Sequence, residues 1–517
     1  MKYKKLVGIL LGFFSTTSFA TANTLISDTP ISLQKLPGFF RFSYESLSMP
    51  EHLQRMGLLG LTYSADITDH FYLGVGGFGA MSGTEGGLFV LGANAGYRHS
   101  IYHHLLGNID FFVGGGGGKS ALVGGGLMLR PSIGLMYDWQ WIRLGVQYSY
   151  INFPTGKIRS SQVSINVDLP TDFYYLPSQN VWAALPKLSD IKLPDGKFLT
   201  FQKNDFGILL QAYRQDSNTI NTNSEKQNGT IKLVGAELNH YFTDHTFWWI
   251  KASGAFSGIP NGYMDVLGGI GYHWSLGNYV ALVPQLGVGA GGGGMVDSGG
   301  GLLLSPTLGV EVPLSSSVAF RLSSGYLWAP KGSFHVVPAT AELLYHLNFA
   351  SGNSSFVKPL NEQYEIQGWR IQLFNQTYFH VQRNIHSTTS PIEMIGVQFD
   401  QLFSPHFFLS YQGAAAYSGF HAGGYATGMI GPGIQSSEYF NQHLQWFGEF
   451  LIGAGGGGGV ALSGGAIVEP VIGFRYAFTR ALGLQASYSQ IKSLQNRLNT
   501  PALNIGLTLR FDALNGV

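Results

Sequence analysis

Apolar and small polar residues alternate along much of the chain. In the stretch LGLTYS at 59–64, the leucines and the tyrosine share one face, while glycine, threonine and serine share the other. The stretches at 143–150 and 481–488 repeat this alternation. A soluble β-sandwich also alternates, but its outer face is normally charged. A period of two residues with a small, neutral polar face therefore predicts transmembrane β-strands. We expect these side chains to face lipid and lumen respectively: Leu61, Val146 and Leu484 outside, and Thr62, Gln147 and Gln485 inside.

Three copies of one sequence pattern follow one another. The block VGGGGGKSALVGGGLMLRPSIG at 113–134 is matched without a gap at 288–309 and 452–473, and a second block at 58–83 recurs in the same way. Such copies mark an internal triplication. Each copy divides into about eight strands, about 24 in total, which is within the range of outer-membrane barrels. In the first copy we expect strands near 38–48, 56–68, 71–81, 86–101, 105–118, 124–139, 142–154 and 160–170.

Two architectures fit the triplication. One transmembrane antiparallel barrel of about 24 strands encloses a wide lumen that needs a plug, whereas three linked eight-stranded barrels have interiors filled by side chains. The long links between copies favour three barrels. Against this, several expected lumen positions hold glycine, too small to fill an eight-stranded interior: Gly74, Gly76, Gly92, Gly96, Gly134 and Gly145. We therefore favour one large barrel, with three linked barrels as the alternative.

The N-terminus has the three parts of a secretory signal peptide. Three lysines precede an apolar stretch at 6–14 and a small-residue cleavage site, Ala-Thr-Ala, at 20–22. The apolar stretch is shorter than the ~20 residues of a membrane-spanning helix, and no later apolar run approaches that length. The expected division of the chain is a signal peptide at 1–22, repeat units at 38–170, 205–348 and 366–517, and linkers at 171–204 and 349–365.

Composition removes several classes of function. Charged residues make up 11% of the chain and hydrophobic residues 45%, the formal net charge is +1, and there is no cysteine. These values exclude a disordered polyelectrolyte, give no electrostatic footprint for nucleic acid, and leave no disulfide or thiolate metal site. We expect no cofactor and no nucleic-acid partner.

The C-terminal strand resembles the assembly signal of Gram-negative outer-membrane β-barrel proteins. Asn504 matches its polar position, Gly506 its glycine, and Leu509 and Phe511 its two apolar positions. Proteins of this class usually end on the final aromatic residue, whereas residues 512–517 follow here. The resemblance implies a location in the outer membrane of a Gram-negative bacterium. It also implies three partners: outer-membrane lipid, lipopolysaccharide and the barrel-assembly machinery.

Three patterns suggest chemistry, and each has a simpler interpretation. The GGGGGKS run lacks the first glycine of a phosphate-binding loop. Histidines that recur at one turn in each copy are better explained by turn capping than by a metal site. A histidine, a serine and a glutamate in one loop have no spacing that specifies catalysis. The residues are the run at 113–120, the turn histidines His70, His245 and His406, and the loop residues His386, Ser387 and Glu393. We expect no catalytic or metal site and no enzyme activity.

One hairpin in each copy has an apolar tip between glycine-rich arms. By strand count the tips lie on the extracellular side, where apolar residues need a cover. In one large barrel the three tips would meet on the axis as an apolar gate, and the glycines would act as hinges. The tip residues are Lys119, Ala121, Leu122, Val123, Met295, Val296, Val460, Ala461 and Leu462. The hinge residues are Gly114, Gly118, Gly124, Gly126, Gly289, Gly294, Gly299, Gly301, Gly453, Gly457, Gly464 and Gly465.

The function that follows is a channel or export pore, and the alternative is a non-conducting barrel protein that displays extracellular loops. Four charged residues of the second copy are inward by alternation: Glu237, Lys251, Glu311 and Arg321. They would line a pore in the first case and form a buried salt-bridge network in the second.

Overall fold

The computed structural model is built almost entirely of antiparallel β-strands. Among the described residues the only helix is the single turn α2 (Ser120–Val123), and none is long and apolar enough to cross a membrane. The described residues are 33–118, 120–177, 193–194, 199–258, 262–277, 279–351, 364–383, 389–440, 443–462, 464–495 and 497–516.

The strand ladders close into three separate rings. Barrel 1 consists of β1 (Gln34–Leu47), β2 (Met56–Asp66), β3 (Phe71–Ser82), β4 (Phe89–Tyr102), β5 (Leu105–Gly117), β6 (Met128–Asp138), β7 (Arg143–Asn152) and β8 (Arg159–Pro177). Barrel 2 consists of β10 (Asn204–Gln215), β11 (Thr230–Tyr241), β12 (Thr246–Ser257), β13 (Met264–Tyr272) continued by β14 (Trp274–Ser275), β15 (Ala281–Gly292), β16 (Leu302–Pro313), β17 (Val318–Gly325) continued by β18 (Leu327–Trp328), and β19 (His335–His346). Barrel 3 consists of β21 (Tyr364–Gln382), β22 (Thr389–Leu402), β23 (Phe407–Ser418), β24 (Ala426–Gln435), β25 (Leu444–Gly456), β26 (Ala466–Ala477), β27 (Leu482–Ser493) and β28 (Asn499–Gly516).

The favoured single large barrel is wrong. In each ring the first strand pairs with the eighth: β1 with β8, β10 with β19, and β21 with β28. A single barrel would instead pair β1 with β28. These ladders instead form three linked eight-stranded barrels, which is the alternative architecture.

Large neighbours explain why glycine does not prevent closure. A Cβ atom at Gly96 would fall on the ring of Tyr72, and one at Gly92 would lie 2.8 Å from the ring of Phe112. A Cβ at Gly145 would lie 2.6 Å from the side chain of Met136. Small and large inward residues therefore alternate so that the larger ones fill a narrow interior.

The two faces of the strands follow the predicted alternation. Val146 is 55% exposed on the outside, whereas Gln147 is 1% exposed inside. The other assigned residues lie on the expected sides: Leu61 and Leu484 outside, and Thr62 and Gln485 inside.

The barrels have two distinct ends. The tip end carries the glycine-rich hairpins between β5 and β6, β15 and β16, and β25 and β26. The opposite, turn end carries the tight turns and the passages of the chain from one barrel to the next. There β8 and β28 extend beyond their barrels and pair with each other, and the short strands β9 (Thr200–Gln202) and β20 (Phe349–Ser351) pair beside them. The expected linkers 171–204 and 349–365 therefore contain strand residues.

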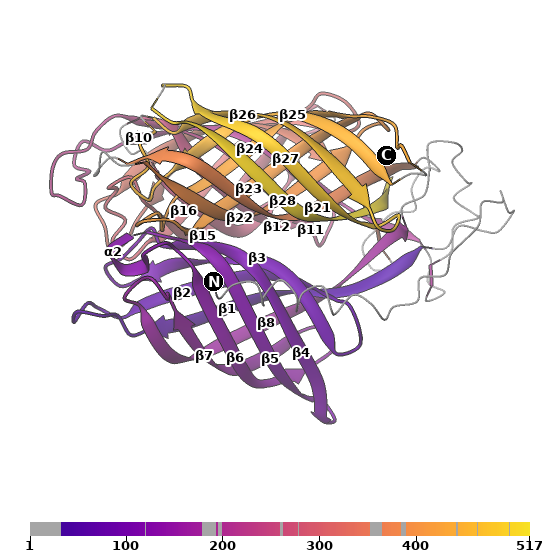
Figure 1. The fold of residues 1–517 in the computed structure, drawn as a ribbon, viewed down its shortest axis with the longest axis horizontal. Helices are drawn as coiled ribbons and strands as arrows, with labels where there is room; N and C mark the ends of the chain where they lie inside the picture. Colours follow the sequence, from indigo (N-terminus) through magenta and orange to yellow (C-terminus); the bar gives the residue numbers. More distant parts are fainter. Residues whose placement is uncertain are drawn as a thin grey trace, which may run out of the picture.

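The three barrels pack in a cycle, of which Figure 1 shows one side, with barrel 1 (indigo to purple) next to barrel 3 (orange to yellow). Strand β3 of barrel 1 contacts β15 and β16 of barrel 2, and β12 of barrel 2 contacts β25 and β26 of barrel 3. Strand β23 of barrel 3 contacts β5 of barrel 1, which completes the cycle. Each barrel thus places its third strand against the fifth strand of the next, as in a heterologous ring of three subunits.

Candidate functional site

Barrel 2 holds a buried ionic cluster in the turn-end half of its interior. Arg321 is 1% exposed and its guanidinium contacts three carboxylates: Glu237 at 3.0 Å, Glu311 at 3.0 Å and Glu342 at 3.2 Å. These side chains come from β17, β11, β16 and β19, so the cluster spans the lumen. Lys251 is buried in the same interior. Of the predicted inward charges, Glu237, Glu311 and Arg321 therefore form a salt-bridge network, whereas the Lys251 ammonium lies 5.8 Å from the ring centroid of Trp249.

Barrels 1 and 3 contain equivalent networks built from other residues. In barrel 1, Arg41 contacts Asp168 at 2.7 Å and Arg130 contacts Glu45 at 2.8 Å. A further carboxylate, Asp110, lies 3.8 Å from each arginine. In barrel 3 the pairs join Arg370 to Asp400 at 2.8 Å and Arg475 to Glu449 at 3.3 Å. The networks differ in sequence position, which is why the copies do not reveal them by matching.

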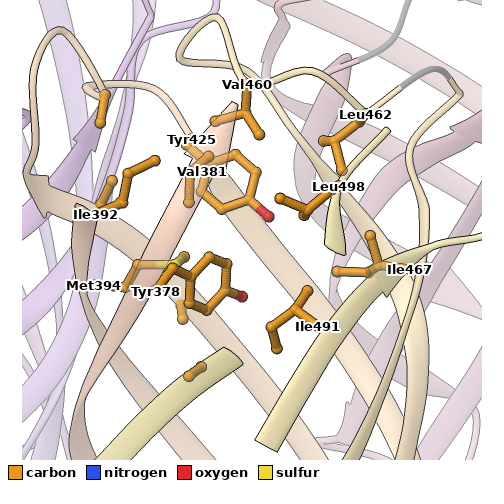
Figure 2. Close-up of a cluster of buried hydrophobic side chains, with 14 of the residues drawn as sticks. Tyr378, Val381, Ile392, Met394, Tyr425, Val460, Leu462, Ile467, Ile491 and Leu498 are labelled. Carbon is orange, nitrogen blue, oxygen red and sulfur yellow. The ribbon is translucent and has the colours of Figure 1, made fainter. Parts of the chain in front are cut away.

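Above the ionic cluster, the tip end of barrel 3 is apolar. Val460 and Leu462 of the hairpin tip pack among inward side chains of the barrel, including Tyr378, Ile467 and Ile491 (Figure 2). Val460 is 3% exposed and Leu462 is 1% exposed. These apolar tip residues are therefore shielded from water by the interior of their own barrel. This cluster closes the tip end.

The other two barrels are capped in the same way. Leu122 and Val123 belong to the buried apolar cluster of barrel 1, and Val296 belongs to that of barrel 2. In barrel 1 the cap meets the ionic network directly, because the Arg130 guanidinium lies 5.3 Å from the ring centroid of Phe78. Within the described residues, each barrel interior thus holds both a buried apolar cap and a buried ionic cluster.

Backbone hydrogen bonds hold each tip to loops or to a strand end of its own barrel. The amide of Lys157 donates to the Leu122 carbonyl at 2.8 Å, and the amide of Thr222 donates to the Met295 carbonyl at 2.9 Å. In barrel 3 the amide of Ala461 donates to the carbonyl of Gln382 at 3.1 Å. The prediction that the three tips meet on one axis is therefore wrong, because each tip covers the interior of its own barrel.

Not every tip residue contributes to a cap. Ala461 is buried, whereas Ala121 is exposed and Met295 is 51% exposed. Lys119 lies outside the described residues. The run that resembles a phosphate loop is followed by the single turn α2, where no helix was expected.

The glycines of the hairpins lie where the barrels meet. Gly126, Gly301 and Gly465 occupy equivalent positions with φ angles of 97°, 95° and 92°. At each of them a Cβ atom would collide with the carbonyl oxygen of an alanine in the adjacent barrel: Ala416, Ala80 and Ala255 respectively. Glycine is required both by the backbone conformation and by this close approach.

The remaining predicted hinge glycines divide into two groups. Those with φ between 58° and 120° favour glycine for conformational reasons: Gly124, Gly294, Gly299, Gly457 and Gly464. Those without such an angle lie within strands or at a strand end: Gly114, Gly118, Gly289 and Gly453. Backbone hydrogen bonds also cross between barrels here, from Gly86 to the Gly299 carbonyl at 3.0 Å and from Gly423 to the Gly124 carbonyl at 2.9 Å.

The strand that resembles an assembly signal closes barrel 3. Asn504 and Gly506 are inward and Leu509 is 43% exposed. Phe511 lies against the extension of β8, with its ring centroid 5.4 Å from that of Phe173. Strand β28 continues to Gly516, so Phe511 is not the last residue of the strand.

The outer surface is apolar around the barrels. Aliphatic side chains such as Ile133, Ile165, Leu286 and Ile472 are between 57% and 63% exposed. Exposed aromatic residues gather towards the turn end: Phe71, Trp139, Trp141, Tyr272, Trp274, Phe407, Tyr476 and Phe478. An aliphatic band bordered by aromatic residues is the surface that a transmembrane barrel presents to lipid.

The residues suggestive of chemistry do not converge. The amides of the turn histidines His70, His245 and His406 donate to hydroxyls of Thr68, Thr243 and Ser404 within their own turns. No group of three potential metal ligands comes together in the described part of the chain. Of the loop trio, Glu393 lies in β22, and His386 and Ser387 lie outside the described residues.

These features define a protein of closed antiparallel β-barrels with an apolar exterior and filled interiors. Neither a protein-family model nor a curated protein sequence matches the chain. Its solved structural neighbours are outer-membrane β-barrel proteins. The siderophore receptor PirA from Acinetobacter baumannii is 11% identical, with 95% of this chain and 81% of that chain covered and a TM-score of 0.28. OpdQ from Pseudomonas aeruginosa is 10% identical, with 93% and 98% covered and a TM-score of 0.21. The NanC porin is 8% identical, with 58% and 98% covered and a TM-score of 0.16. At these TM-scores the likeness carries no argument about function.

Proposed function

We propose that this protein is an integral outer-membrane protein of a Gram-negative bacterium, composed of three non-conducting barrels that together support a loop-bearing surface. The observation that carries the proposal is an apolar exterior around interiors occupied by ionic clusters and apolar caps. The role is non-enzymatic. Three small barrels with filled lumens leave no path for a hydrated solute.

The proposed orientation follows from the connections. Outer-membrane barrels have short periplasmic turns and longer extracellular loops. The turn end therefore faces the periplasm and the capped tip end faces outward. Residues 1–22 would be removed during export, and the barrel-assembly machinery would insert the mature chain among outer-membrane lipid and lipopolysaccharide.

Membrane embedding is tested by placing arginine at two heights on the outer surface of barrel 1. Val146→Arg puts a charge on the outer band of β7 and should cost about 2–4 kcal/mol of folding stability, as at a bilayer midplane. Trp141→Arg puts the same charge in the turn before β7, where Trp141 is 75% exposed, and should cost about 0–1 kcal/mol, as near the membrane interface. The measurement is the urea dependence of the heat-modifiable gel mobility of the protein folded into lipid vesicles. Equal sensitivity of the two variants would refute the embedding.

A gated channel is the second candidate function, with one gate per barrel. The glycines with left-handed backbone beside each tip, such as Gly124, Gly294 and Gly457, favour it because they permit the tips to swing. The hydrogen bonds that fasten the tips oppose it. Single-channel recording of the wild-type protein separates the two, since the first proposal expects no current steps across the voltage range.

A further inference from the structure

The outer face of barrel 2 carries a groove that crosses several strands. Its volume is ≈ 590 Å³, and it extends from Leu308 in the middle of β16 to Lys232 near the tip end of β11. The lining includes alanines on two adjacent strands, Ala212 on β10 and Ala339 and Ala341 on β19. Because these side chains are short, they leave a depression beside the exposed Leu210.

Two cations stand at the tip end of this groove. Arg214 and Lys232 are both exposed on the outer face of adjacent strands, and the ladder places Lys232 opposite Ala212, two residues from Arg214. Within the described part of the chain, neither side chain has an ion-pair partner. Cations on the outer face of a barrel are favourable where they meet anionic headgroups.

The same positions in the other barrels have none of these features. Where barrel 2 has Ala339 and Ala341, barrel 1 has Val163 and Ile165, and barrel 3 has Leu503 and Ile505. Lys232 corresponds to Gly57 in barrel 1 and Glu393 in barrel 3. The position of Arg214, two residues further along the first strand than the partner of Lys232, falls on Ser48 in barrel 1 and Phe379 in barrel 3. The small lining and the two cations therefore occur together in barrel 2 and in neither of the other barrels.

We propose that barrel 2 binds one molecule of a phosphorylated, acylated lipid, the lipid A part of lipopolysaccharide. Arg214 and Lys232 hold a phosphate group, to which the arginine presents paired donors and the lysine a point charge. An acyl chain lies in the groove over Ala339 and Ala341. The choice of lipid A rests on the proposed function, in which the tip end faces outward and therefore lies in the outer leaflet of the membrane. The other two barrels face lipid without such a site.

The test uses the full mature protein, delipidated in detergent and titrated with bisphosphorylated lipid A. Native mass spectrometry measures the fraction of protein carrying one lipid. Arg214→Gln with Lys232→Gln should weaken binding at least tenfold. Ala339→Val with Ala341→Ile installs the residues of barrel 1, which fold in the same environment there, and should weaken binding about fivefold through the acyl chain.

The matched control removes two exposed cations from loops of the same barrel. Lys226→Gln with Lys331→Gln changes the net charge equally but leaves the groove intact, so its affinity should stay within twofold of wild type. Lipid A without phosphates should bind wild type and both charge variants with the weak affinity of the Arg214/Lys232 double variant, and the Ala339/Ala341 variant about fivefold more weakly still. Equal losses in the two charge variants would overturn the site, because they would indicate general attraction to a cationic protein. If lipid A does not bind one to one while the arginine pair at Val146 and Trp141 behaves as expected, the lipid site is wrong and the membrane proposal stands. Failure of that arginine pair refutes the membrane proposal instead.

Discussion

The two halves of the barrel 2 interior are filled by different interactions. The turn-end half holds Arg321 among three carboxylates, while Val296, Leu303 and Leu327 belong to a buried apolar cluster that occupies the tip end. A buried carboxylate at the tip end, Asp265, accepts hydrogen bonds from the cluster tyrosines Tyr213 and Tyr263. A water-filled pore keeps a polar inner face along its whole length. An inner face that changes from ionic to apolar along the same strands instead belongs to a packed interior. A polar lumen face in the middle of a strand therefore does not by itself indicate a channel.

The ionic half is the more vulnerable to a single change. Arg321→Ala leaves Glu237, Glu311 and Glu342 facing one another without their common counter-charge, and we expect a loss of about 3–5 kcal/mol in the free energy of unfolding. Urea titration of the protein in detergent, followed by heat-modifiable mobility, measures the loss.

A combined variant serves as the control for this charge effect. Arg321→Met together with glutamine at all three glutamates removes both signs of charge, and it should be more stable than Arg321→Ala. If Arg321→Ala unfolds at the wild-type urea concentration, the cluster does not hold the barrel together.

The apolar half should respond to lost packing. Leu462→Ala removes a buried side chain from the cap of barrel 3 and should cost about 2–4 kcal/mol. Leu503→Ala, on the outer face of the same barrel, provides the comparison because Leu503 is 40% exposed. The same urea titration should show the smaller loss for Leu503→Ala. A larger loss there would mean that the tip does not pack as a cap.

The smallest effect concerns the seam between barrels at the apolar end. Gly301→Ala forces a non-glycine residue into a positive φ and brings its Cβ atom against the carbonyl of Ala80 in barrel 1. Gly277→Ala forces a similar φ, 104°, but its Cβ atom would have no neighbour within 4 Å. The difference between the two variants isolates the inter-barrel clash, which we expect to be about 1–2 kcal/mol, the scale of local backbone strain. Identical unfolding free energies would remove the close approach from the account.

The sequence predicts the strands and their faces well, because alternation is a local property. In copy one the expected strand at 71–81 corresponds to β3 (Phe71–Ser82), and the expected strand at 142–154 contains β7 (Arg143–Asn152). Alternation could not predict how the rings close. The pairing of β1 with β8 joins residues far apart in the chain, and the alternation would be the same in one large barrel or in three small ones.

The inward glycines led to the wrong prediction of one large barrel, and Gly96 and Tyr72 show the physical reason. Gly96 is small because Tyr72 fills the space beside it, so the volume of an interior cannot be judged from its smallest residues. The apolar caps were missed because they lie at strand ends. In β2 the inward residues change from Met56 and Leu58 at the tip end to Thr62 and Ser64 further along. This change within one face is the signal that sequence analysis could have used.

The most direct test of three separately closed barrels is a single-channel recording after removal of all three tips. Residues 119–123, 295–298 and 459–462 are deleted together, and heat-modifiable mobility verifies that the protein is folded before it is inserted into a planar bilayer. We predict that the variant stays without steady current, because an ionic cluster still fills each lumen beneath its lost cap. A large, steady conductance from the folded variant would contradict the account, since it would mean that the tips had closed a continuous lumen.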